Sequence, residues 1–248
     1  MSTRAQNLLL LLFGSAVLLA AGTGTYLNYV RPVMFWFLLA SGLVICLLAV
    51  SGMAEDVRSM QVEDWNDPDP GDSPADHGHP HGHAHGATRV AWVLVVPVLL
   101  LLFAAPPPLG ADAASTVSVA SAEPADMRAF PPLPSGAAPA MSLFDFQDRA
   151  VSDSTGALDH RDVTLTGFVQ RRGSQVLMGR LMIWCCVADA RTILVSLQGD
   201  HVTARPGSWV TAVVRLVPGT ATRNNMYTPT AKVASWREVP VPRNQYDY

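Results

Sequence analysis

The chain has 248 residues, a formal net charge of −3 and 49% hydrophobic residues. Nucleic-acid-binding proteins normally carry clustered basic charge. The net negative charge of this chain gives no sign of it, so we expect no nucleic-acid partner. Three cysteines are too few for a disulfide framework. The apolar residues are concentrated before residue 110, which indicates a protein anchored in a lipid bilayer.

Two apolar stretches near the N-terminus are long enough to cross a bilayer. Leu8–Gly24 is followed, after a short turn, by the uncharged stretch Val33–Ser51. Arg4 in front of the first stretch also fits a signal peptide, but a second span follows at once and the intervening residues make a poor cleavage site. We expect residues 1–51 to form an antiparallel transmembrane hairpin.

A third apolar stretch, Val90–Gly110, carries no charge and ends at a run of prolines. Pro97 lies inside it and predicts a kink, because proline removes one backbone hydrogen bond of a helix. The sequence therefore predicts three transmembrane helices, the third at residues 90–110.

The arginines predict the orientation of these spans. Arg4 precedes the first span, Arg58 and Arg89 flank the second loop, and no Lys or Arg then occurs until Arg128. The positive-inside rule places the N-terminus and the central loop in the cytoplasm and the C-terminal region outside, in a multi-pass protein of the cell membrane. Arg31, in the first turn, is the one charge that disagrees.

The central loop, residues 52–89, has two parts. The first part is acidic, is interrupted by Pro and Gly, and holds too few apolar residues to pack a core, so we expect it to be disordered. The second part alternates histidine with Gly, Pro and Ala; its histidines are His77, His79, His81, His83 and His85. Imidazole is a good zinc ligand, and small spacers let the chain fold around an ion. A solvated tract that binds metal only incidentally is the alternative.

The C-terminal part begins with a Pro/Ala/Ser-rich spacer at residues 111–140, which we interpret as an extended tether. Residues 141–248 are predicted to form a domain that opens with a short helix at Ser142–Val151, capped by Ser142. Five strands follow. They are predicted at Asp162–Arg171, Gln175–Val187 with a bend or bulge at Gly179, Thr192–Gln198, Ser208–Val217 and Pro229–Val239.

This number and spacing of strands favours a small all-β domain, an OB-like barrel, with a small sandwich as the alternative. The predicted fold is thus a membrane α-helical part of three transmembrane helices plus this exterior domain. The domain lacks a stripe of aromatic and basic residues, so we do not assign it the nucleic-acid binding of other OB folds.

Two adjacent cysteines and an aspartate form the most specific element of the domain: Cys185, Cys186 and Asp189. Four interpretations are open. The residues bind a metal, together with His160 or His201; the cysteines form a vicinal disulfide; they are structural; or one is a nucleophile. A nucleophile is the weakest of these, because no His/Asn partner pattern accompanies the pair.

Several of these features together resemble a bacterial family of membrane proteins described as subunits of a two-component permease. The resemblance rests on YLNYVRP at Tyr26–Pro32, the histidine-rich loop, APPPLGA at Ala105–Ala111, LTGFV at Leu165–Val169 and CCVADA at Cys185–Ala190. It implies a three-span protein whose C-terminal domain, with a CCxAD motif, has no known function. It also implies a partner, a separate multi-spanning permease in the same membrane.

We therefore expect a non-enzymatic accessory subunit of a membrane permease that handles zinc. Transport by this chain alone is disfavoured, because its spans hold no ionisable side chain apart from Cys46. Two other classes stay open: a membrane-anchored exterior thiol-redox or metal-dependent enzyme, and a structural scaffold of the cell envelope.

Overall fold

The computed structural model describes residues 3–63, 107–115, 117–119, 126–199 and 202–248. The chain divides into two compact units. One consists of Met1–Tyr26 and Pro32–Pro106, and the other of Leu27–Arg31 and Pro107–Tyr248. The short segment between the first two apolar helices thus belongs to the C-terminal unit.

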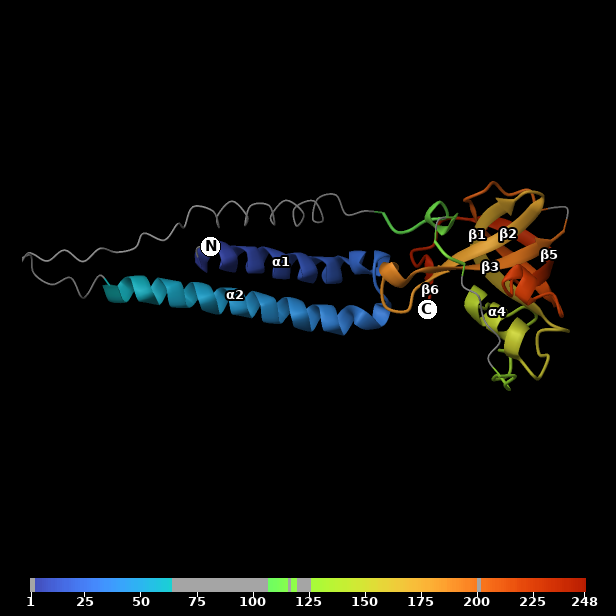
Figure 1. The fold of residues 1–248 in the computed structure, drawn as a ribbon, viewed down its shortest axis with the longest axis horizontal. Coiled ribbons are helices and arrows are strands. Elements are labelled where there is room, and N and C mark those ends of the chain that lie inside the picture. The colour runs from blue at the N-terminus through green and yellow to red at the C-terminus, as the bar shows by residue number, and fades with distance from the viewer. Residues whose placement is uncertain (1–2, 64–106, 116, 120–125, 200–201) are drawn as a thin grey trace, which may run out of the picture. The chain divides into compact units, whose positions relative to one another are not determined.

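Two long apolar helices, α1 (Thr3–Thr23) and α2 (Phe35–Glu63), form the described part of the first unit. Each is long and apolar enough to cross a membrane, as predicted for the first two spans. They run antiparallel and side by side (Figure 1). Arg4 near the start of α1 pairs with Asp56 of α2 at 2.6 Å. Two short 3-10 helices, η1 (Thr25–Asn28) and η2 (Pro32–Met34), lie between them.

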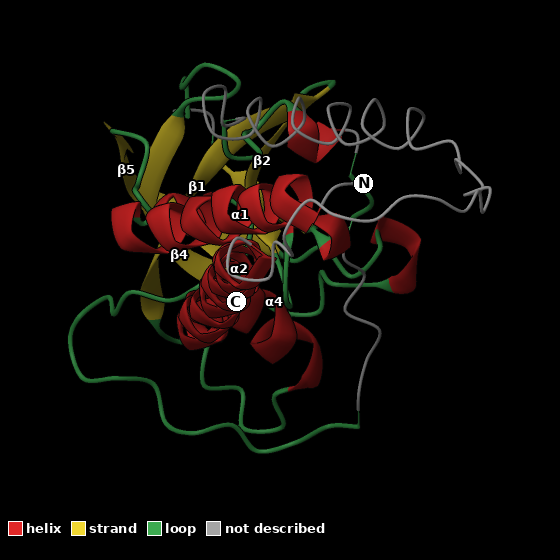
Figure 2. Ribbon diagram, turned by 90° about the vertical axis from the view of Figure 1, so that its left-hand side faces the viewer, coloured by secondary structure: helices red, strands yellow, loops and turns green. Residues whose placement is uncertain are grey.

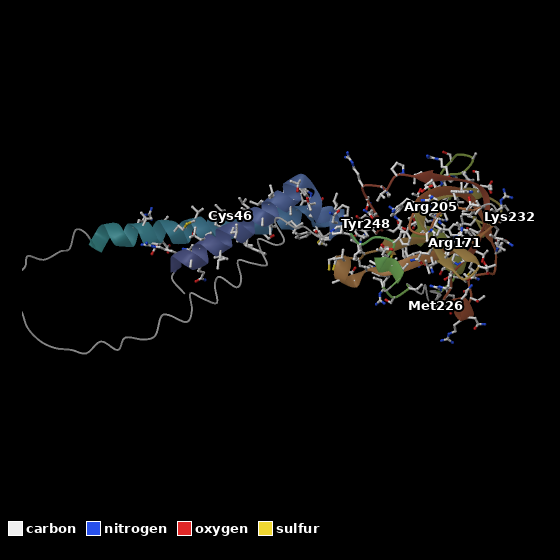
Figure 3. All side chains as sticks on the ribbon, turned by 90° about the horizontal axis from the view of Figure 1, so that it is seen from above. Cys46, Arg171, Arg205, Met226, Lys232 and Tyr248 are labelled. Atoms are coloured by element: carbon white, nitrogen blue, oxygen red, sulfur yellow. The ribbon has the colours of Figure 1, made fainter. Side chains whose placement is uncertain are left out.

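The helices approach closely at glycines. A Cβ atom at Gly14 would lie 2.7 Å from Sγ of Cys46, and one at Gly42 would lie 2.9 Å from the Leu18 side chain. Cys46, labelled in Figure 3, therefore packs within the hairpin. Close backbone approach at small residues is a common way for apolar helices to associate.

Helix α2 continues past the predicted end of the second span at Ser51, into residues for which we expected disorder. Its last part, AEDVRSMQVE, holds no Gly or Pro and consists mostly of good helix formers, so a helix that has already begun extends through it. Residues 90–106 of the third predicted span lie outside the described residues, and only Pro107–Gly110 of it are described.

The C-terminal unit is built on one six-stranded sheet (Figure 2). Its strands are β1 (Asp162–Arg172), β2 (Gln175–Met182), β3 (Arg191–Gln198), β4 (Trp209–Val217), β5 (Thr230–Val239) and β6 (Tyr246–Asp247). The first five correspond to the predicted strands. Strand β6 was not predicted, and β2 ends five residues before the expected Val187.

The strand pairings form a closed circuit. β1 pairs with both β2 and β4, β4 pairs with β5, and β2 pairs with β3, all antiparallel. A parallel pairing of β3 with β5 completes the circuit. β6 adds to β2 in parallel, at Leu181 and Met182.

The strands contribute alternating apolar side chains to one main core. Among its fully buried members are Val163, Leu165, Met178, Ile193 and Val214. Such alternation places every second side chain of a strand on one face. A second cluster lies around Tyr246 and contains Phe168, Leu181, Ile183 and Trp209.

Helix α4 (Leu143–Ser152) packs on the main core, and Figure 1 shows it beside the sheet. As predicted, Ser142 is its N-cap, and the Ser142 hydroxyl accepts a hydrogen bond from the Asp145 amide at 2.9 Å. Leu143 and Phe146 face the core and are fully buried. The apolar face of the helix thus lies where the cap and the spacing of its apolar residues direct it.

Gly179 is not the site of a bend or bulge. It pairs regularly with Phe168 of β1 and Leu194 of β3. A Cβ atom at this position would lie 2.5 Å from the Phe168 ring, so the glycine makes room for that ring. The register shift of the sheet lies instead between Val213 and Val214, in the β4–β5 pairing.

The described parts of the Pro/Ala/Ser-rich stretch lie against the β domain. Ala114 of η3 (Ala113–Ser115) and Leu133 are buried. Single β-bridges join Val119 to Thr192 and Ala140 to Thr164. These residues of the stretch predicted to be a tether are thus attached to the domain.

Candidate functional site

The loop between β2 and β3 carries the predicted cysteines and aspartate. Cys185, Cys186 and Asp189 each offer one ligand atom, and these atoms all lie within 4.8 Å of one another. Cys185 is exposed, whereas Cys186 and Asp189 are half-buried. Of the predicted metal ligands, the structure brings these three together.

The Asp189 carboxylate organises the loop. One oxygen accepts the Trp184 amide at 2.9 Å, and the other accepts the Cys185 amide at 2.8 Å and the Cys186 amide at 3.4 Å. These three consecutive amides turn toward one carboxylate, so the chain leaves the β2 direction here and continues into the 3-10 turn η4 (Val187–Asp189). This explains why β2 stops before the cysteines.

The two thiols lie on the same side of the loop. Their Sγ atoms are 3.6 Å apart, and both cysteines are free. On a regular strand, adjacent side chains point to opposite faces. The turn imposed by Asp189 removes that alternation and makes the thiols neighbours.

The electrostatics of the loop keep Cys185 protonated. Its hydrogen bond with the Asp189 carboxylate, followed by that with Cys186, raises the pKa of the Cys185 thiol from 9.0 to about 11. Burial alone would raise the pKa of Asp189, but hydrogen bonds from the Cys185 thiol and the loop amides outweigh burial and lower it. A thiol with a raised pKa is a poor nucleophile at neutral pH, which disfavours covalent catalysis by Cys185.

The segment Leu27–Arg31, which we call the link, is bound to this loop by its backbone. Val30 forms an antiparallel bridge with Cys186. The Val187 amide donates to the Tyr29 carbonyl at 2.8 Å, and the Arg31 amide donates to the Cys185 carbonyl at 3.2 Å. The link therefore behaves as a short partner strand for the cysteine loop.

The side chain of Arg31 adds two further contacts within the same unit. Its guanidinium donates to the Trp184 carbonyl at 3.4 Å and lies 5.6 Å from the centre of the Tyr248 ring. Tyr248 is labelled in Figure 3. The one arginine that disagreed with the predicted orientation is thus held by the C-terminal domain.

Tyr246 of β6 connects the link to the C-terminal end of the third predicted span. Its hydroxyl donates to the Asn28 carbonyl at 3.0 Å and accepts the Leu109 amide at 2.8 Å. Tyr246 itself is only 1% exposed. The hydroxyl therefore satisfies one backbone group of each segment inside the protein.

The predicted histidine ligands are not part of this cluster in the described structure. His77, His79, His81, His83 and His85 lie outside the described residues, as does His201. His160 is described and exposed, but it is not among the residues whose ligand atoms meet at the cysteine loop.

Reasoning from the sequence missed the backbone groups of the link and the hydroxyl of Tyr246. The link's only signal was Arg31, a charge on the unexpected side of the membrane. Tyr246 gave none, since β6 is two residues long and follows a segment without alternation.

Residues 149–248 match the family model described as the DUF1980 C-terminal domain. This agrees with the predicted C-terminal domain of unknown function. No curated protein and no solved structure gives a match.

Proposed function

We propose that this chain is a non-enzymatic accessory subunit of a membrane permease and that it presents Cys185, Cys186 and Asp189 to zinc on the exterior side. The observation that carries this proposal is the meeting of the three ligand atoms within 4.8 Å on an accessible loop. The resemblance to permease subunits supplies the partner.

The spacing of the thiols suits zinc. Two thiolates bound at about 2.3 Å to a tetrahedral zinc ion lie about 3.8 Å apart. The observed Sγ–Sγ distance is 3.6 Å, so both sulfurs reach one ion with little movement. Zinc binding would displace the thiol protons, as it does wherever cysteine is a ligand.

The site is suited to exchange rather than storage. Three protein ligands leave at least one of four tetrahedral positions open to water or to a residue of the partner. Asp189 also accepts three backbone amides, which leaves its carboxylate less available to a metal. An open site with one weakened ligand fits a subunit that passes zinc to a permease.

The membrane arrangement we propose has three spans, with the N-terminus and the loop of His77–His85 in the cytoplasm and the β domain outside. Three crossings place the link and the C-terminal end of the third span on the same side. The hydrogen bonds of the Tyr246 hydroxyl to Asn28 and Leu109 support this, because they join those two segments. The histidine tract would then handle zinc on the opposite side from the cysteines.

We further infer that the domain is an OB-like barrel. The support is the closed circuit β1–β2–β3–β5–β4, whose single parallel pairing joins β3 and β5. Closure removes exposed strand edges, as in other small barrels.

The test of the site is a zinc titration of the whole reduced, metal-free chain in nanodiscs, with the histidines of 77–85 replaced by alanine. Cys185→Ser/Cys186→Ser is the test variant and Cys46→Ser the matched control. We expect the double variant to lose one zinc site and the control to keep it. Equal binding by all three chains would overturn the metal site, and a thiol-dependent oxidoreductase activity of the unsubstituted chain would favour the redox alternative.

The partner is tested separately, by affinity purification of the tagged chain from native membranes. A multi-spanning permease should co-purify, and it should still do so with the double serine variant, since the cysteines are proposed to bind zinc. Recovery of the chain without a permease would refute the accessory-subunit role.

A further inference from the structure

The cysteine loop exposes a large aromatic side chain. Trp184 directly precedes Cys185 and is 52% exposed, whereas its neighbour Ile183 is fully buried. The backbone of Trp184 is fixed at both ends, because its amide donates to Asp189 and its carbonyl accepts from Arg31. The loop therefore presents an indole to the outside at a fixed place on the domain.

Chain connectivity limits the distance between the residue that holds this tryptophan and the start of an apolar helix. The link residue Arg31, which contacts the Trp184 carbonyl, is followed by η2 and then by Phe35, the first residue of α2. Successive Cα atoms are about 3.8 Å apart, so Phe35 begins within about 15 Å of Arg31. Whatever surrounds the first turn of α2 is therefore within reach of the cysteine loop.

The first turn of α2 has the character of a membrane interface. It begins Phe35-Trp36-Phe37, and Trp36 and Phe37 are 73% and 67% exposed. Tryptophan is enriched where the hydrocarbon meets the headgroups, because its ring is apolar and its indole N–H is polar. Trp184 has the same chemistry at a position tied to the same turn of the chain.

We propose that the Trp184 indole inserts into the interfacial layer of the bilayer spanned by α1 and α2, so that the thiols of Cys185 and Cys186 open at the membrane surface. This inference rests on the membrane anchoring proposed above. Zinc bound at the loop would then be received or released at the bilayer face, where a permease in the same membrane has its mouth.

The test uses the full chain in liposomes of phosphatidylcholine and phosphatidylglycerol, with tryptophan fluorescence quenched by lipids brominated near the top of the acyl chain. Trp184→Phe should remove a part of the quenchable fluorescence comparable to that removed by Trp36→Phe. Trp236→Phe, which replaces a half-buried tryptophan of β5, should leave the quenchable part unchanged.

The two possible failures are distinguishable. If Trp184→Phe behaves like Trp236→Phe while Trp36→Phe reduces quenching, Trp184 does not contact lipid and the inference is wrong. If Trp36→Phe also has no effect, α2 does not begin at a membrane interface and the anchoring itself fails. Circular dichroism of each variant checks that the fold is kept.

Discussion

Two regions of the β domain are organised in the same way, by an aspartate that gathers backbone amides. Asp189 accepts the amides of residues 184–186 in the exposed cysteine loop. Asp247 accepts the amides of Leu143 and Phe144 at the start of α4, at 2.9 and 3.2 Å, and forms an ion pair with Arg180 at 3.0 Å. The same interaction thus shapes a surface loop in one region and joins three elements in the other.

The surroundings give the two carboxylates opposite properties. Burial raises the pKa of Asp247 in spite of Arg180 and the two amides. The pKa of Asp189 is lowered, because hydrogen bonds there outweigh burial. Burial thus makes the ionised form of Asp247 costly, and its structural role rests on its contacts with α4 and Arg180. Asp189 instead positions accessible thiols and contributes less to the fold.

Removing the buried carboxylate should have the largest effect. Asp247→Ala leaves the Arg180 guanidinium without its ion-pair partner and two helix amides without an acceptor, inside the protein. Breaking a buried pair in this way costs about 3–5 kcal/mol. We expect a loss of that size in chemical denaturation of the detergent-solubilised chain, followed by tryptophan fluorescence.

Glu238→Ala removes an exposed carboxylate of β5 and is the matched control. It should change stability by less than about 0.5 kcal/mol. A loss for Asp247→Ala as small as that for Glu238→Ala would mean that the buried aspartate does not have the structural role assigned to it.

Tyr246→Phe should have an intermediate effect, because Tyr246 connects the two regions. The substitution removes one hydroxyl and leaves the Asn28 carbonyl and the Leu109 amide unpaired, at a cost of about 1–2 kcal/mol. Hydrogen exchange should also become faster at the Arg31 and Val187 amides, which hold the link to the loop.

Tyr248→Phe is the control for this change, since it removes a hydroxyl that donates to the exposed Asn244 side chain at 2.8 Å. If hydrogen exchange at these amides is unchanged in both variants, the Tyr246 hydroxyl does not help to position the loop.

Local signals in the sequence predicted much of this fold. Ser142 and Asp145 identified the cap of α4, and the alternation of Val163, Leu165 and their successors identified the strands. Each of these signals acts within a few residues, where the physical cause is also local. Prediction failed where the cause is distant, as at β6, which exists because Tyr246 and Asp247 pair with Leu181 and Met182.

The candidate site divides in the same way. The short spacing of Cys185, Cys186 and Asp189 was enough to predict that these residues act together. It gave no sign that Val30 and Arg31, more than 150 residues earlier, complete the loop. Backbone partners leave no side-chain pattern to read, so only the structure reveals them.

Asp189→Asn should have the smallest effect on stability. It also tests the exposed cysteine loop directly. The asparagine carbonyl still accepts from a loop amide, so the loss should stay within about 1 kcal/mol. Thiol chemistry should change more. Without the carboxylate, the pKa of Cys185 returns from about 11 toward 9.0, and the thiolate fraction at pH 8 rises about a hundredfold. A thiolate with a lower pKa is also a weaker nucleophile, which cancels about a factor of ten of this increase. Alkylation of Cys185 should therefore become about ten times faster.

The measurement is iodoacetamide modification of the metal-free chain, followed by mass spectrometry, in a background of Cys46→Ser and Cys186→Ser that leaves one thiol. The rate for the chain with Asp189 should keep rising with pH well above 9.0, because the hydrogen bond with Asp189, the largest cause of the raised pKa of Cys185, is kept. The rate for Asp189→Asn should level off at lower pH. Identical pH profiles would show that the carboxylate does not control Cys185, and the contrast between the two aspartates would then reduce to a difference in burial.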